Sequence, residues 1–162
     1  MNLWVLIVIV IVLYIYISYY YRYPSNVSII QSALSYFDVN LLQEKQPIVL
    51  EDKPEDIQMF KQSWFKWNYT KYYQMPEQVP EKWYKNQYKY LIIQPQESIE
   101  LYLCPANIKF VNDIPPAEET LIIMKLKAKQ IVILPFHWKY MIQTYQPIYY
   151  MGVHDVLTPF LP

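Results

Sequence analysis

The chain has 162 residues with 14 basic and 14 acidic side chains, so it has no net positive field with which to gather nucleic-acid phosphates. A single cysteine, Cys104, excludes an internal disulfide, and a single glycine, Gly152, excludes the glycine-rich loops that bind nucleotide phosphates. The 18 Tyr, 6 Phe and 5 Trp residues suit membrane interfaces and protein contacts as well as a core. We therefore expect no nucleic-acid partner.

The first 23 residues are predicted to form a transmembrane anchor. The segment 3–21 carries no charge, and a helix of its length spans about 28 Å, close to the hydrocarbon thickness of a bilayer. Bulky residues follow it, whereas a cleaved signal peptide needs small residues at the cleavage point. Aromatic and basic residues at its two ends are expected at the membrane interfaces: Trp4, Tyr19, Tyr20, Tyr21 and Arg22.

The orientation of the anchor depends on few charges. The α-amino group and Arg22 nearly balance, and further basic residues begin only at Lys45, which favours a C-terminal domain facing the cytoplasm. Two sequons, at Asn26 and Asn68, would be glycosylated only if the domain faced a lumen. The expected partners are membrane lipid and either a second protein or another copy of this chain.

Residues 24–45 are predicted to form a juxtamembrane amphipathic helix. Ser25 or Ser28 can cap its first amides, and core packing is favoured over the membrane surface because the apolar face lacks Lys and Arg. The apolar residues that recur at spacings of three and four are Ile29, Ile30, Ala33, Leu34, Phe37 and Leu41.

Residues 46–162 are predicted to form one β-rich domain. The segment 46–50 has the pattern of a short strand, and Asp52 and Pro54 then indicate the start of a second amphipathic helix. Ile57, Phe60, Trp64 and Trp67 fall on one side of that helix, as in a core face. The segment 69–87 is rich in Tyr, Gln and Pro without a clear period, which predicts an irregular connection.

Short strands are predicted throughout the rest of the chain, so the expected class is α+β with a small antiparallel sandwich or barrel. Segment 131–134 is apolar on both faces and should be a central strand, whereas 121–127 alternates and should have one solvated face. The run 153–162 either completes the sheet or forms an exposed tail that docks on a partner. The predicted strands are 88–93, 98–103, 108–111, 120–127, 130–134, 138–143 and 148–150.

Segment 124–142, MKLKAKQIVILPFHWKYMI, resembles a late hairpin of cupin-like barrels, the class that includes the JmjC-type oxygenases. Segment 46–50, QPIVL, resembles the early strand of that class, and the two segments cover about a quarter of the chain. A single-pass anchor ahead of such a domain is similar to membrane proteins of large cytoplasmic DNA viruses. The resemblance implies an antiparallel β domain and, in the metal-binding members, a bound iron.

The chain departs from that family where the metal would bind. Tyr140 stands where metal-binding members carry a histidine, and Ala128-Lys129 replace the turn glycine. The only histidines are His137 and His154, and Asp155, next to His154, would point to the opposite face of a strand. These three residues are the only candidate metal ligands, and we predict no metal, no cofactor and no catalytic residue.

The pattern as a whole favours a non-enzymatic, single-pass membrane protein that has a structural role or binds another protein. The resemblance to viral membrane proteins implies a virion or host membrane as its location. One alternative is an iron-dependent oxygenase of the cupin class. Another is a sugar- or peptide-binding module that uses tryptophan rings as stacking platforms: Trp64, Trp67, Trp83 and Trp138.

Overall fold

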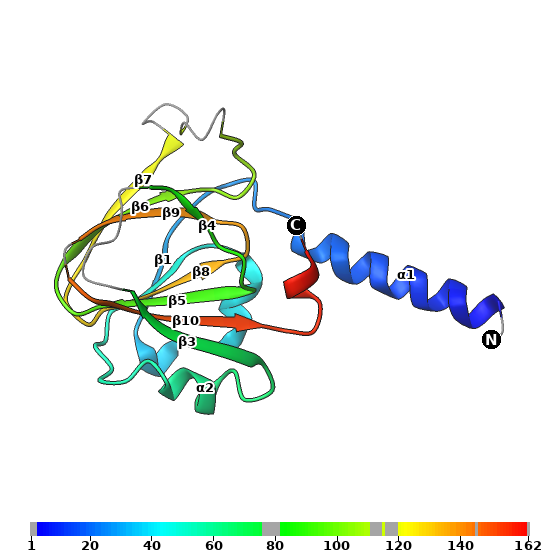
Figure 1. Cartoon of the computed structure of the whole chain (residues 1–162), viewed down its shortest axis with the longest axis horizontal. Coiled ribbons are helices and arrows are strands. Elements are labelled where there is room, and N and C mark those ends of the chain that lie inside the picture. Colours follow the sequence, from blue (N-terminus) through cyan, green and yellow to red (C-terminus); the bar gives the residue numbers. More distant parts are fainter. Residues whose placement is uncertain (1–2, 76–81, 111–114, 116–119, 145, 162) are drawn as a thin grey trace.

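The computed structural model describes residues 3–75, 82–110, 115, 120–144 and 146–161, and it has one long helix attached to a β domain (Figure 1). The helices are α1 (Leu3–Tyr20) and α2 (Met59–Ser63), with 3-10 helices η1 (Leu34–Tyr36), η2 (Val39–Glu44) and η4 (Thr158–Phe160). The strands are β1 (Ile30–Ser32), β2 (Ile48–Leu50), β3 (Tyr69–Met75), β4 (Tyr84–Lys85), β5 (Tyr90–Pro95), β6 (Ile99–Cys104), β7 (Ile122–Leu126), β8 (Ile131–Pro135), β9 (Lys139–Gln143) and β10 (Ile148–His154).

Helix α1 projects away from the β domain, and this confirms the predicted N-terminal apolar helix (Figure 1). Its 18 residues give a length of about 27 Å, and the helix is long and apolar enough to cross a membrane. The side chains from Leu3 to Ile17 are exposed, and within the helix only Tyr20 is buried.

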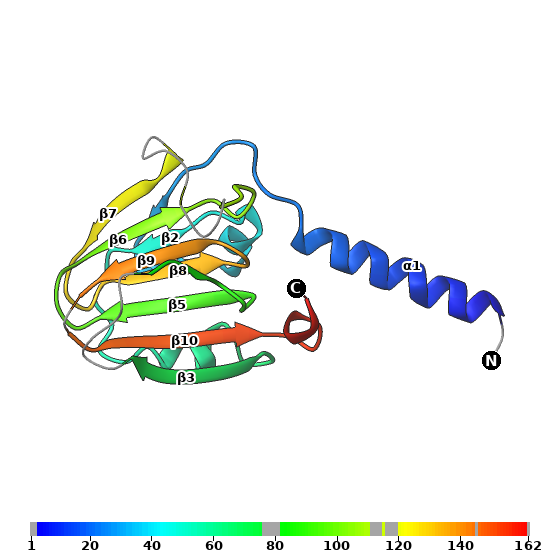
Figure 2. The same cartoon turned by 45° about the horizontal axis from the view of Figure 1, so that its top comes forward.

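The β domain contains two sheets in the described residues, and the class is α+β with mostly antiparallel pairing, as predicted (Figure 2). A six-stranded sheet has the order β1-β2-β8-β5-β10-β3, in which only β1 and β2 run parallel. A four-stranded sheet has the order β4-β9-β6-β7 and is antiparallel. The sheets do not close on each other, so the barrel alternative is wrong.

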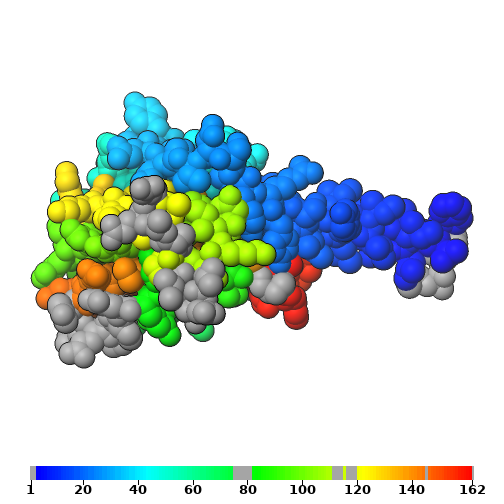
Figure 3. Space-filling model, turned by 90° about the horizontal axis from the view of Figure 1, so that it is seen from above, coloured from blue at the N-terminus to red at the C-terminus, as the bar shows by residue number. Residues whose placement is uncertain are grey.

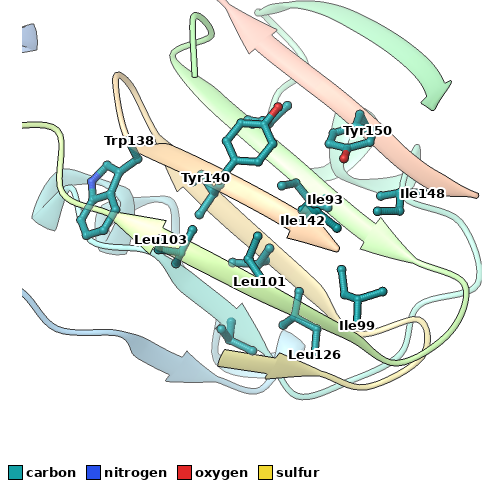
Figure 4. Packing of buried hydrophobic residues seen from close by; sticks show 14 residues of the cluster. Ile93, Ile99, Leu101, Leu103, Leu126, Trp138, Tyr140, Ile142, Ile148 and Tyr150 are labelled. Atoms are coloured by element: carbon teal, nitrogen blue, oxygen red, sulfur yellow. The ribbon is translucent and has the colours of Figure 1, made fainter. Parts of the chain in front are cut away.

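The space between the two sheets is filled by side chains that alternate along the strands (Figure 4). Ile93 of β5 points into it from one sheet, and Leu101 and Leu103 of β6 point into it from the other. Leu91 of β5 belongs to the same cluster. Larger rings complete this inner core: Trp138, Tyr140 and Tyr150.

A second core lies on the other face of the six-stranded sheet, beneath η1, η2 and α2. Ile131 and Ile133 of β8 point into it together with Ile92, whereas Val132 and Leu134 face the inner core. Strand β8 is therefore buried on both faces, which confirms the predicted central strand at 131–134. Strand β7 is an edge strand with Ile123 exposed, which confirms the predicted solvated face.

The predicted amphipathic helix at 24–45 is wrong, because β1, η1 and η2 occupy that segment. Ile30 pairs with Ile48 in the sheet, and the Asp38 side chain accepts a hydrogen bond from the Asn40 amide, which starts a new 3-10 turn. Of the periodic residues, Phe37 is buried and Leu34 and Leu41 are partly buried, but against the sheet instead of along a helix face. Pairing with β2 outweighs the weak helix propensity of a segment rich in Ser and β-branched residues.

Three further predictions in the β domain are wrong. The second helix has only five residues, so Trp67 lies beyond its end and is 92% exposed, although Ile57 and Phe60 are buried as predicted. The segment predicted to be irregular contains β3, which pairs with β10 along its length, and also β4. Residues 108–110 form no strand, and Val111 lies outside the described residues.

Candidate membrane-junction site

The last turn of α1 docks on the β domain through aromatic and polar contacts, and this junction is the candidate site. Tyr20 is 4% exposed, and its ring meets Phe136 edge-on at a centroid distance of 5.3 Å. Tyr21 contacts Phe136 and His137 in the same way. The helix is thus held at a fixed point of the domain.

Asp155 forms the polar centre of the junction. It follows β10, and its Oδ2 accepts hydrogen bonds from the hydroxyls of Tyr16, at 2.5 Å, and Tyr20. Its Oδ1 accepts from the Thr158 amide at 3.0 Å and from the Thr158 hydroxyl at 2.8 Å, and Lys89 Nζ lies 3.4 Å from Oδ2. Burial acts to raise the pKa of this carboxyl, but the hydrogen bonds from Tyr16, Tyr20 and Thr158 outweigh it and lower the pKa.

Lys45 caps the C-terminal end of α1. Its Nζ donates to the carbonyl of Tyr19 and, at 2.8 Å, to the carbonyl of Arg22, and it lies 4.1 Å from the centre of the Tyr19 ring. A cation at the C-terminal end of a helix is stabilised by the negative end of the helix dipole. Burial, together with the nearby Arg22 charge, lowers the pKa of the Lys45 ammonium to about 8.

The turn between β8 and β9 completes the junction. His137 has a φ of 66°, and its Nδ1 lies 3.2 Å from the hydroxyl of Tyr23. Asn86 holds this turn from the inside. Its backbone carbonyl accepts a hydrogen bond from the His137 amide, and its side-chain Nδ2 donates to the backbone carbonyls of Leu134 and Pro135. The turn therefore presents Phe136 and His137 to the helix from a rigid base.

The hollows in the described part of the chain do not resemble a ligand site. A cavity at the junction, between Tyr20, Lys45 and Trp138, has a volume of about 20 Å³, far below the roughly 300–1,000 Å³ of ligand pockets. Two larger depressions, beside Asp52 and beside Glu100, are open to solvent.

The candidate metal ligands occupy different surroundings. His137 faces Tyr23, the ring of His154 lies 5.4 Å from that of Tyr88, and Asp155 is engaged by tyrosines, Thr158 and Lys89. Among the described residues, no group of three or more His, Cys, Asp or Glu side chains is placed to hold a metal ion. Tyr140, at the family's histidine position, points into the inner core and stacks on Tyr84 (Figure 4).

The remaining sequence-based candidates are dispersed. Trp138 is buried, Trp64 packs on Phe37 and Phe60, Trp83 meets Phe110 edge-on, and Trp67 is exposed. Cys104 is buried, as expected of a small apolar residue. Asn26 is exposed and Asn68 is partly buried, so the two sequons differ in access.

Of the expected interface residues, Trp4 is exposed near the free end of α1, and Tyr19, Tyr20, Tyr21 and Arg22 lie at the junction. The sequence does not predict the roles of Asp155 and Lys45, because their partners in α1 and directly after it lie more than 20 residues away in the chain. No protein-family model, no curated protein and no solved structure matches the chain.

Proposed function

We propose that this protein is a non-enzymatic, single-pass membrane protein whose β domain acts through contacts. The observation that carries the proposal is α1: this largely apolar helix of 18 residues is exposed along almost its whole length, while its last turn is bound to the domain through Asp155 and Lys45. Such an apolar surface is stable in lipid but not in water. The junction holds the β domain at one end of the helix.

The inner core supports a role without catalysis. The space between the two sheets holds Trp138, Tyr140 and Tyr150 packed among aliphatic side chains, and Tyr140 is the residue at the position where metal-binding cupin-like domains carry a histidine. The order of β7, a turn, the apolar strand β8 ending at Pro135, and β9 agrees with the resemblance. We infer a cupin-like domain that has exchanged its metal site for a packed core, with a virion or host membrane as its setting.

Membrane anchoring is tested by making the middle of α1 polar. The full chain is expected to stay with membranes after alkaline carbonate extraction, and a variant with Ile9→Lys and Val12→Lys is expected to be released, because each charge at the bilayer centre costs about 3 kcal/mol. Tyr36→Lys, at an exposed position of the domain, is the matched control and stays with the membrane. Release of the unaltered chain by carbonate contradicts the proposal.

The contact role is tested at exposed apolar positions away from the helix. Tyr72, on the edge strand β3, is 42% exposed, and Ile123, on the edge strand β7, is 57% exposed. A photo-crosslinking residue at each position, in the full chain on its own membrane, is expected to give a discrete adduct with a protein or a second copy at one of them. A crosslinker at exposed Glu97 serves as the control. Absence of a discrete adduct at both positions contradicts the contact role.

A further inference from the structure

Two exposed apolar segments lie at the end of the β domain from which α1 projects. One is the C-terminal segment after β10, where Val156 is 67% exposed and Phe160 is 80% exposed. The other runs from the end of α2 to the first residue of β3, where Trp67 is 92% exposed and Tyr69 is 64% exposed. We call these four residues the juxtamembrane patch.

Strand pairing places the two segments side by side. Tyr69, the first residue of β3, is the register partner of His154, the last residue of β10. Val156 therefore follows one strand end, and Trp67 precedes the neighbouring one. Figures 1 and 2 show this end of β3 and β10, together with η4, on the side of the domain that faces α1.

Asp155 fixes the level of the C-terminal segment along the helix. It accepts hydrogen bonds from both Tyr16 and Tyr20, which are one turn apart, so the start of the segment lies beside the last turn of α1. Figure 3 shows the C-terminal residues in red against the base of the blue helix. If α1 spans a bilayer, this level is that of the membrane–water interface.

The chemistry of the patch fits the same interface. Trp, Tyr and Phe rings partition into the headgroup region, and lysines that flank them keep their ammonium groups in water. Lys66 lies with its Nζ 6.0 Å from the centre of the Trp67 ring, and Lys89 lies beside Asp155. Arg22 and Lys45 add positive charge at this end, where Asp155 is a neighbouring acidic group.

We propose that the juxtamembrane patch inserts into the headgroup region of the bilayer that α1 crosses, so that the β domain lies on the membrane at two further points instead of standing away from it. This inference rests on the proposed anchoring. The occupant of the patch is phospholipid, because the patch continues the surface by which the chain would already meet lipid.

The test measures the depth of spin labels on the full chain in vesicles of dioleoylphosphatidylcholine. A Cys104→Ala background carries one new cysteine at a time, at Trp67, Phe160, Tyr36 or Val10. Tyr36 is the matched control, because it lies at the end of the β domain away from α1. Strand β8 ends beside α1, and β1 runs in the opposite direction to β8. The chain that follows β1, which includes Tyr36, therefore begins at the opposite end of the sheet. Val10 lies in the middle of α1 and reports the anchor itself.

We expect labels at positions 67 and 160 to collide more with oxygen than with a water-soluble nickel chelate, and the label at position 36 to show the reverse. An aqueous signature at either position 67 or position 160 overturns the two-point contact, and so does shielding from both reagents, which would indicate a protein partner or a second copy. If position 10 is in lipid in those cases, the anchoring stands; an aqueous position 10 overturns both proposals.

A second measurement avoids added labels. Phosphatidylcholine brominated near the headgroup is expected to quench the tryptophan fluorescence of the unaltered chain. Trp67→Phe is expected to remove most of the quenching that comes from tryptophans of the β domain. Trp83→Phe is the control, because that ring is partly buried against Phe110. Equal quenching in the Trp67→Phe variant and the unaltered chain contradicts the inference.

Discussion

The Asp155 side chain accepts several of the hydrogen bonds that hold α1 on the β domain. Its carboxylate joins α1, β10 and η4 through Tyr16, Tyr20 and Thr158. Asp155→Asn keeps the shape but removes the charge that strengthens these bonds, so we expect a loss of about 2 kcal/mol and a fall in Tm of roughly 5 °C, measured on the full chain in detergent. Glu97→Gln, at an exposed turn, is the control, and an equal effect of both variants contradicts the assigned role.

The same carboxylate gives a pH dependence with a defined sign. The pKa of Asp155 in the folded chain lies below its ordinary value of 3.8, so its contribution is fully present above about pH 4 and is lost as the pH falls further. The difference in Tm between the unaltered chain and Asp155→Asn is therefore expected to be constant from pH 7 to pH 5 and to shrink below pH 4. A difference that grows on acidification would have the wrong sign.

Gly152 is required by packing. A Cβ at this position would overlap the ring of Tyr88, which lies between Tyr73 and His154. Gly152→Ala is expected to cost about 1–3 kcal/mol, measured by thermal unfolding, because the inner core has no room for a methyl group. The cost should fall sharply in a Tyr88→Ala background, and a cost that is equal in both backgrounds would show that the ring is not the cause.

At the scale of elements, the turn between β7 and β8 contains a residue in the left-handed conformation. Lys129 has a φ of 63°, and its amide donates to the carbonyl of Pro95 at 2.8 Å. Lys129→Gly is expected to raise the stability by about 0.5 kcal/mol, because relief of the left-handed strain exceeds the added entropy of the unfolded chain. Ala128→Gly has no such strain to relieve and is expected to destabilise. The same sign for both variants in thermal unfolding contradicts this account.

The sequence predicted elements whose pattern is local. The apolar run of α1 and the two-sided apolar strand β8 each follow from neighbouring residues. Segment 24–45 could not be predicted, because the same residues, including Phe37 and Leu41, satisfy a helical period and are packed on the core by a strand and 3-10 turns. Strand β3 was missed because its partner, β10, lies at the other end of the chain.

In the whole molecule, the candidate site likewise depends in part on contacts between segments that are far apart in the sequence. The anchor and its aromatic end were predictable from hydropathy and from Trp4, Tyr19 and Arg22. The junction depends on the return of the chain after β10 to the base of α1, which places Asp155 beside Tyr16. Only the assembled sheets bring these residues together, and they make the helix and the domain one unit.

Thiol labelling from one side of the membrane tests whether α1 crosses the bilayer. In a Cys104→Ala background, Leu3→Cys and Ser25→Cys place one cysteine at each end of the helix. An impermeant maleimide added to sealed vesicles is expected to label only one of the two positions, and the other is labelled only after detergent is added. Because the β domain is expected to face the cytoplasm, Ser25→Cys is expected to be the position on the cytoplasmic side. Labelling of both positions from the same side would contradict a membrane-spanning helix.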